Sequence, residues 1–496
     1  MIFAHKSPRL ILALLLAGST LAGTVQAASE IAAQVSARDS LEAARQAFHQ
    51  VPPSVLLPRS SRALLPKTND TQTPLPKLDQ AQQQAVQQII KAAAQRAAQR
   101  QAQKGGAQSG QTPSPSLADI LQLDNDRHVN LALEKLFPHT VVPRGGHAVS
   151  ELPRALRNME AVRIPTGDSG SISVKDWMND TATDGLLVLH RGQIAYEFHD
   201  RAMGEQQPHA LWSVGKSLAG LVAVDLVQEG TLDASAPISH YLPDMQGSAW
   251  EDATVQETLD MTTAIGYEEG VTVETPGVIH YLIAAGMIPA PEGYTGEKNV
   301  GDFLKTLSKA GEHGQVFRYK SVDTDVIIRV MEKVTGKSYA ELLSERIWQP
   351  MGAETNGYVL QDGSGAQLAG MGAGSILRDL GRLGEVLRLE GRYNGQQILQ
   401  PGTVENIRQG GSREALQASP DGSRWTGYSY HDFWWVSHDE DGTFEAKGFS
   451  GQHIHVNPAA ELVIVKLSSY GTPDPFATHV QDRRAFAAIA GLVRGN

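Results

Sequence analysis

Hydrophobic residues recur at helical spacing directly after a short polar motif near the middle of the chain. After Lys216 the apolar residues fall three or four positions apart, at Leu218, Leu221, Val222 and Leu226. This spacing is typical of a helix, and Gly230 stands where a glycine commonly ends one. The motif before the run is Ser213-Val-Gly-Lys216, so the pattern predicts that Ser213 lies at a helix N-terminus.

Short apolar runs predict strands on both sides of the central region. Two runs, at 184–190 and 193–198, are joined by Arg191-Gly192 and are typical of a hairpin. Three more strands are expected near the C-terminus, at 443–447, 452–457 and 461–468. A final helix is expected at 475–492.

Helical patterns fill the sequence between the two groups of strands. They are expected at 255–262, 321–334, 338–348 and 376–389. Ser321 or Asp323 is the expected N-cap of the second of these helices. Residues 263–300, rich in Gly, Pro, Glu and Tyr, form what we call the access segment, because a long insertion beside a site usually shapes entry. This order predicts an α+β fold, with one antiparallel sheet built from both chain ends, flanking helices and a helical lobe.

The first 120 residues differ from the rest. Lys6 and Arg9 precede an apolar run, and Val25-Gln26-Ala27 offers small residues for cleavage, so residues 1–27 are expected to be a signal peptide of a periplasmic or secreted protein. The run is too interrupted to predict a stable membrane span after cleavage. Residues 28–120 are rich in Pro and then in Gln and Ala, which predicts an arm or linker with one helix at 79–103. Residues 121–496 are the expected folded domain.

Composition narrows the classes of function. The chain is 41% hydrophobic and 20% charged, as in soluble globular proteins, and it has no cysteine, which excludes disulfides, thiolate metal ligands and a cysteine nucleophile. Residues 1–27 carry +2 and residues 28–120 carry +4, so the total of −11 leaves −17 for residues 121–496. A strongly acidic domain does not favour a nucleic-acid partner.

The spacing of Ser213 and Lys216 suits nucleophilic catalysis. Residues three apart on a helix share a face, so the amine can reach the hydroxyl, and burial can remove its charge so that it accepts a proton. The unpaired N–H groups of a first helical turn could also stabilise an oxyanion. The alternative is an N-cap serine followed by a solvated lysine.

Two histidines near the C-terminus are candidate metal ligands. His453 and His455 alternate along an expected strand, but no third ligand lies nearby in sequence, so a structural role is favoured. We expect neither a metal nor a cofactor.

Three motifs in order carry a family resemblance. Ser213-Val-Gly-Lys216, Tyr319-Lys-Ser321 and Gly448-Phe-Ser-Gly-Gln452 resemble those of the serine β-lactamase and penicillin-binding-protein superfamily over residues 140–496. The chain is most similar to the class C-like branch, which includes esterases and D-aminopeptidases, and within that branch it most resembles the 6-aminohexanoate-dimer (nylon-oligomer) hydrolases. The resemblance implies a β-lactamase-like α+β fold with an all-α lobe.

The resemblance also implies roles for residues. Ser213 would be the nucleophile, Lys216 its proton acceptor, and Tyr319 the relay of a proton to the leaving group, with a buried structural tyrosine as the alternative for Tyr319. The backbone N–H groups of Ser213 and Phe449 would form the oxyanion hole. The expected substrate-binding residues are Trp212, Tyr267, Glu268, Ser321 and Gly448.

One motif departs from the family pattern. Where family members carry Lys-Thr-Gly, this chain has Ala446-Lys447-Gly448, and Lys447 should point to the other face of its strand. We therefore expect short linear amide or ester substrates. Glu268 and Glu269 either contact a substrate amine or are solvated side chains. A β-lactamase, a D-amino-acid peptidase, a carboxylesterase and a non-catalytic binding protein remain alternatives, and no pattern defines an oligomeric state.

Overall fold

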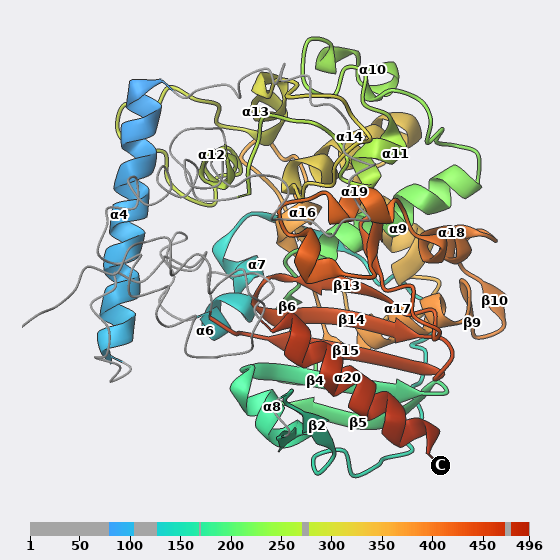
Figure 1. Ribbon diagram of the computed structural model, residues 1–496. Coiled ribbons are helices and arrows are strands. Elements are labelled where there is room, and N and C mark those ends of the chain that lie inside the picture. The colour runs from blue at the N-terminus through green and yellow to red at the C-terminus, as the bar shows by residue number, and fades with distance from the viewer. Residues whose placement is uncertain (1–78, 104–125, 168–169, 270–276, 472–477, 496) are drawn as a thin grey trace, which may run out of the picture. The chain divides into compact units, whose positions relative to one another are not determined.

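A seven-stranded antiparallel sheet organises the domain (Figure 1). The computed structural model describes residues 79–103, 126–167, 170–269, 277–471 and 478–495. The sheet has the order β11-β12-β13-β14-β15-β4-β5. Its strands are β4 (Thr183–His190), β5 (Gln193–His199), β11 (Ser429–His431), β12 (Trp434–Val436), β13 (Phe444–Gly448), β14 (Gln452–Asn457) and β15 (Leu462–Ser468). Val188 of β4 pairs with Ile464 of β15, which confirms that both chain ends build one antiparallel sheet.

Two strands of this sheet were missed by the sequence analysis. β11 and β12 are three residues each and are joined by a tight turn at Asp432 and Phe433, both with positive φ. Strands this short do not develop a readable alternation of apolar and polar positions. The predicted sheet of five strands is therefore extended to seven.

The sheet is buried on both faces. Along β4, Leu186 and Val188 face α8 (Val174–Asp180) and α20 (His479–Arg494), while Leu187 and Leu189 belong to the larger core on the other side. Helix α17 (Leu377–Arg388) covers that second face. Burial on both faces explains the continuous apolar runs at these strands.

A helical lobe lies beside one end of the sheet (Figure 1). Its helices are α10 (Ile238–Tyr241), α11 (Val255–Leu259), α12 (Val278–Ala284), α13 (Val300–Thr306), α14 (Ser321–Thr335) and α19 (Arg413–Gln417). Helix α9 (Val214–Gln228) is buried along almost all of its length and packs on both α14 and the sheet. Helix α14 begins at Ser321 with Lys320 as its N-cap, so both expected caps lie inside the helix.

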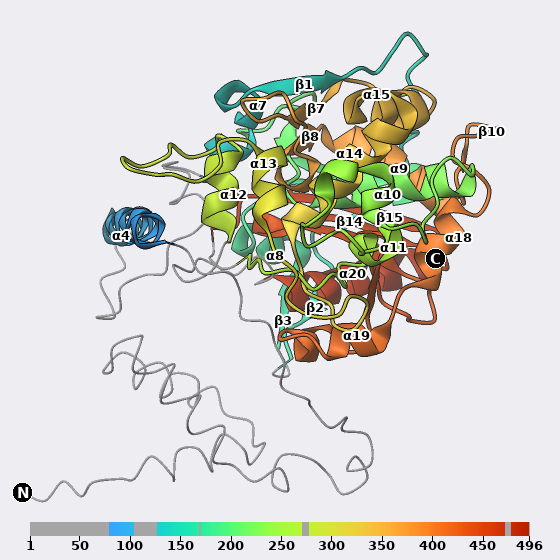
Figure 2. The ribbon, with the colours of Figure 1, turned by 90° about the horizontal axis from the view of Figure 1, so that it is seen from above.

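A smaller sheet of order β1-β7-β8-β6 packs on the side opposite α20 (Figure 2). Its strands are β1 (His139–Val142), β6 (His209–Ala210), β7 (Gly357–Leu360) and β8 (Ala373–Ser375). The remaining elements are α6 (Asp126–Asn130), α7 (Leu133–Leu136), β2 (Arg163–Pro165), β3 (Ser171–Ser173), η3 (Pro243–Met245), α15 (Tyr339–Leu343), the π-turn η4 (Ser344–Trp348), α16 (Ala369–Gly372), β9 (Arg392–Tyr393), β10 (Gln396–Gln397), α18 (Thr403–Gln409), η5 (Gly422–Trp425) and η6 (Phe449–Gly451).

Two glycines let α9 approach neighbouring backbone closely. A Cβ atom at Gly215 would lie 2.2 Å from the carbonyl oxygen of Ala369 in α16, and one at Gly220 would lie 2.0 Å from that of Asp432. No side chain fits at either position. The glycine inside Ser213-Val-Gly-Lys216 therefore has a packing reason, and it brings α16 against the first turn of α9.

The N-terminal predictions are only partly within the described residues. Helix α4 (Gln80–Gln103) confirms the helix expected at 79–103. The expected signal peptide and the rest of the arm lie outside the described residues. Within the described ranges, no helix combines the length and the apolar character needed to cross a membrane.

Candidate active site

Ser213 follows a left-handed residue at the start of α9. Trp212 has a φ of 48°, a conformation that costs a non-glycine residue free energy and persists where surrounding contacts hold it. Its indole nitrogen donates to Asn130 Oδ1 at 2.8 Å, and its ring meets Phe449 edge to face with centroids 5.9 Å apart. These contacts fix the turn that presents Ser213 as the N-cap of α9.

Lys216 is fully buried next to Ser213. Its Nζ lies 2.8 Å from Ser213 Oγ and 2.5 Å from the carbonyl oxygen of Gly370 in α16. Burial lowers the pKa of Lys216 to about 8, against the charges of Glu269 and Asp325, which raise it. A neutral amine here can donate one N–H to Gly370 and still direct its lone pair at the Ser213 hydroxyl.

Tyr319 completes the group around Ser213. Lys216 Nζ lies 5.1 Å from the centre of the Tyr319 ring, and the phenol hydrogen-bonds with Ser213. Burial raises the pKa of Tyr319 above its ordinary value despite this hydrogen bond, so the phenol keeps its proton at neutral pH. The ring stacks at 15° on Trp435, with centroids 6.2 Å apart.

The end of β13 packs directly against the segment before Ser213. A Cβ at Gly448 would lie 2.5 Å from the carbonyl oxygen of Leu211, so glycine is required for this approach. The turn that follows is held by Gln452, whose Nε2 donates to the Phe449 carbonyl at 2.9 Å and to the Ser468 carbonyl at 2.6 Å. Phe449 and Ser213 are thereby brought to neighbouring backbone segments.

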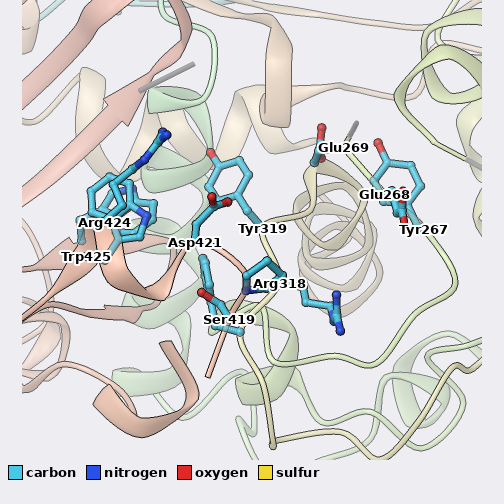
Figure 3. Close-up of a pocket in the computed structure, with 12 residues that line it drawn as sticks. Tyr267, Glu268, Glu269, Arg318, Tyr319, Ser419, Asp421, Arg424 and Trp425 are labelled. Atoms are coloured by element: carbon cyan, nitrogen blue, oxygen red, sulfur yellow. The ribbon is translucent and has the colours of Figure 1, made fainter. Parts of the chain in front are cut away.

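A cleft of about 430 Å³ opens beside Tyr319 (Figure 3). Its lining residues are Tyr267, Glu268, Glu269, Phe317, Arg318, Tyr319, Ser419, Pro420, Asp421, Arg424, Trp425 and Trp435. Figure 3 shows Tyr319 between Asp421 and Trp425 on one side and Glu269 and Tyr267 on the other. The cleft therefore joins an aromatic wall to charges of both signs, next to the group formed by Ser213, Lys216 and Tyr319.

The expected substrate-binding residues separate into two sets. Tyr267 and Glu268 line the cleft. Trp212, Gly448 and Ser321 are buried and lie outside its lining. The backbone N–H of Ser321 instead donates to the carboxylate of Glu269, so Ser321 ties the start of α14 to the access segment.

The Lys447 side chain forms an ion pair with Glu445 of the same strand. Its Nζ lies 2.6 Å from Glu445 Oε2, and both side chains are buried. His455 Nδ1 lies 2.9 Å from the other Glu445 oxygen, while His453 Nε2 lies 3.0 Å from Asp482. The two histidines thus contact different carboxylates, and Lys447 is neutralised within its own strand.

Several residues around Ser213 were missed by the sequence analysis. Gly370 contacts Lys216 through its backbone carbonyl, which leaves no signature in the sequence. Trp425 and Trp435 form the cleft wall only because η5 and β12 meet in space. Asp325 carried little signal, since the same helix also contains Asp323, Arg329 and Glu332.

Comparisons with known proteins agree with this geometry. The Beta-lactamase family model matches residues 174–489. The chain is 31% identical over 374 residues to the 6-aminohexanoate-dimer hydrolase of Paenarthrobacter ureafaciens, covering 75% of this chain and 92% of that protein. It is 26% identical over 191 residues to Esterase EstB of Burkholderia gladioli, covering 36% and 45% respectively.

A solved structure extends the same likeness to the fold. It is that of a Bacillus anthracis protein provisionally described as a 6-aminohexanoate-dimer hydrolase, with a TM-score of 0.67 and 28% identity, over 74% of this chain and 94% of that one. The family match begins in α8 and ends in α20, so it encloses Ser213, Lys216, Tyr319 and the whole lining of the cleft. The chain therefore belongs to the β-lactamase family, within the superfamily of serine β-lactamases and penicillin-binding proteins.

Proposed function

We propose that the protein is an exported serine hydrolase that cleaves short linear amides or esters through an acyl-enzyme on Ser213. The observation that carries this proposal is the 2.8 Å contact between Ser213 Oγ and the buried amine of Lys216. The 31% identity to a 6-aminohexanoate-dimer hydrolase supports the substrate class.

Acylation follows from the contacts around Ser213. Its Oγ attacks the carbonyl carbon of the substrate while neutral Lys216 takes the hydroxyl proton. The tetrahedral intermediate then expels an amine or an alcohol, which takes up a proton through Tyr319. Water, deprotonated by the same groups, attacks the acyl carbonyl, and the acid product leaves with Ser213 protonated again.

The negative charge of the intermediate needs nearby donors. The backbone N–H groups of Ser213 and Phe449 are proposed for this role, since the close approach of Gly448 to Leu211 brings their segments together. A lost backbone donor of this type typically costs catalysis about 10²-fold or more.

The charges of the cleft support a linear substrate better than a β-lactam. Lys447 is paired with Glu445 and Ala446 carries no charge, so neither is available to a β-lactam carboxylate. The cleft carries Glu268, Glu269 and Asp421 with Arg318 and Arg424, so it is less uniformly acidic than the net charge of the domain suggests. Glu268 and Glu269 remain the proposed contacts for a substrate amine.

Esterase activity is a second candidate that shares the site. The partial similarity to Esterase EstB favours it, and an alkoxide leaves with less help from Tyr319 than an amine does. Comparing kcat/KM for a p-nitrophenyl ester, an aminohexanoate-type dimer and nitrocefin distinguishes these possibilities. Nitrocefin turned over tenfold faster than both others would contradict our interpretation of Ala446 and Lys447.

A fluorophosphonate probe tests whether the protein is an enzyme at all. We expect covalent labelling of Ser213, located by peptide mass spectrometry, and no labelling of Ser213→Ala. A folded wild-type protein that stays unmodified would instead support a binding protein.

A further inference from the structure

A carboxylate outside the proposed catalytic group lies buried in α14 with few hydrogen-bond donors around it. Asp325 is 2% exposed, and among the described residues only the Tyr281 hydroxyl offers it a hydrogen bond. Burying a carboxylate with so few donors costs free energy, so the case requires an explanation. A purely structural carboxylate would be expected to have several donors.

Asp323, on the same helix, shows what a structural carboxylate looks like here. It accepts hydrogen bonds from Trp250 Nε1 at 2.9 Å and from Thr263 Oγ1 at 2.7 Å. Lys320 Nζ lies 3.7 Å away from it. The two buried acids therefore have different surroundings, because Asp323 has two donors and a nearby lysine, whereas Asp325 has the Tyr281 hydroxyl.

Asp325 lies behind the residue that holds Lys216. A Cβ built on Gly370 would be 3.7 Å from Asp325 Oδ1, and the Gly370 carbonyl accepts the hydrogen bond of Lys216 Nζ. The charges of Asp325 and Lys216 act on each other. Helices α9, α14 and α16 thus enclose a lysine and a carboxylate in one buried region.

The other groups that face Asp325 are acids and phenols. They are Tyr281 from α12, Tyr267 and Glu269 from the access segment, and Asp362 after β7. The Tyr281 hydroxyl hydrogen-bonds with Asp325, and the Tyr267 hydroxyl with Glu269. Lys216 is therefore the cation with which Asp325 can interact in this set.

We propose that Asp325 is a positioning residue that sets the protonation of Lys216 and stabilises the ammonium formed when Lys216 takes the proton of Ser213. This inference rests on the proposed function, since it concerns the proton acceptor of that reaction. An ionised carboxylate in a low-dielectric region favours a nearby ammonium. The carboxylate therefore makes Lys216 a stronger base during acylation. It also increases the fraction of free enzyme in which Lys216 is already protonated.

The direction of the pKa values agrees with this arrangement. Burial raises the pKa of Asp325 to about 7, against the Tyr281 hydroxyl and Lys216, which lower it. The pKa of Lys216 is lowered to about 8 by burial. Both groups therefore titrate near neutrality, and their apparent pKa values belong to the pair.

The test is the pH dependence of kcat/KM for ester hydrolysis by Asp325→Asn. If neutral Lys216 is required, kcat/KM rises with pH to a plateau. Removing the carboxylate should move the midpoint of this rise down by about 1 unit and lower the plateau. A merely structural role would lower stability or the plateau without moving the midpoint.

Two further variants keep the test decisive. Asp323→Asn is the matched control, because it makes the same change on the same helix, and its midpoint should stay at the wild-type value. If Asp325→Asn does not fold, the pH profile of kcat/KM for Tyr281→Phe tests the role of Asp325 instead. Loss of that hydroxyl disfavours ionised Asp325, so the midpoint should again move down, by less.

The outcomes separate this inference from the proposed function. A wild-type enzyme that turns over esters with an unshifted midpoint in a folded Asp325→Asn, or an equal shift in Asp323→Asn, would overturn the role of Asp325 alone. If Tyr281→Phe is used instead, a midpoint equal to that of the wild type would likewise overturn the role of Asp325. A wild-type protein with neither turnover nor fluorophosphonate labelling at any pH would overturn the proposed function, and this inference with it.

Discussion

At the scale of single residues, the chemistry depends on where the proton of Ser213 can go. We expect Ser213→Ala to abolish ester turnover, and Lys216→Ala and Tyr319→Phe each to lower kcat/KM on the order of 10²-fold, because general acid-base assistance is lost. Tyr430→Phe, which removes a hydroxyl from a buried ring that packs on Tyr319 outside the lining of the cleft, is the control and should stay close to wild type. Normal turnover by Ser213→Ala would rule out the mechanism.

The second residue-scale prediction concerns Lys447. Lys447→Met should lower the free energy of unfolding by about 3 kcal/mol, because it leaves the buried carboxylate of Glu445 without its lysine. The ratio of nitrocefin to ester hydrolysis should not change. Urea denaturation measures the first effect, and steady-state kinetics measures the second. A selective tenfold loss of nitrocefin hydrolysis would show that Lys447 binds the substrate carboxylate after all.

At the scale of elements, a histidine joins α11 to the turn between β11 and β12. His431 Nδ1 lies 2.8 Å from Asp260 and its Nε2 lies 3.3 Å from the buried Asp432. Although burial opposes it, the hydrogen bond to Asp260 and the charge of Asp432 raise the pKa of His431 to about 9 from 6.5. Protonated His431 therefore stabilises the fold below pH 6.5, and this contribution is lost as pH rises to 9.

The expected consequence is a pH-dependent difference between two proteins. Between pH 6.5 and 9 the wild type should lose about 2 kcal/mol more unfolding free energy than His431→Gln does. Urea titrations of both proteins at the two pH values measure it. Parallel losses would mean that His431 is not charged in the folded state.

Helix α9 offers a second test at this scale. Gly220→Ala should destabilise the protein by about 2 kcal/mol, because its Cβ would lie 2.0 Å from the Asp432 carbonyl. Gly491→Ala in α20, where no atom lies within 4 Å, should instead stabilise it by about 0.5 to 1 kcal/mol through helix propensity. Thermal unfolding of both variants compares them, and equal effects would contradict the packing of α9 on the β11–β12 turn.

At the scale of the whole molecule, the prediction concerns export. Cleavage after Ala27 should give a mature protein that begins at Ala28, because a basic start and an apolar run precede small residues at the cut. Mass spectrometry of the N-terminus from the periplasmic or secreted fraction checks this. Cytoplasmic protein that retains Met1 would remove the proposed localisation.

The sequence predicted the contacts of single residues better than it predicted the number of strands. Serine and lysine three positions apart before an apolar helix, with a tyrosine at the start of another helix, were enough to predict a contact that the structure has at 2.8 Å. The sequence also predicted that Lys447 points to the opposite face of its strand from Ala446, because successive strand residues alternate between faces. The number of strands was not, since β11 and β12 are too short to show alternation.

Local patterns determined what depends on neighbours along the chain: the helix after Ser213, the hairpin of β4 and β5, and the side of β13 on which Lys447 lies. Only the tertiary structure decided which distant groups meet, because packing between elements is set by the shapes of their surfaces. The carbonyl of Gly370, the carboxylate of Asp325 and the wall formed by Trp425 and Trp435 reach the site in this way. The sequence thus determined that Ser213 and Lys216 lie together, whereas the surroundings of Lys216 exist only once α9, α14 and α16 are packed together.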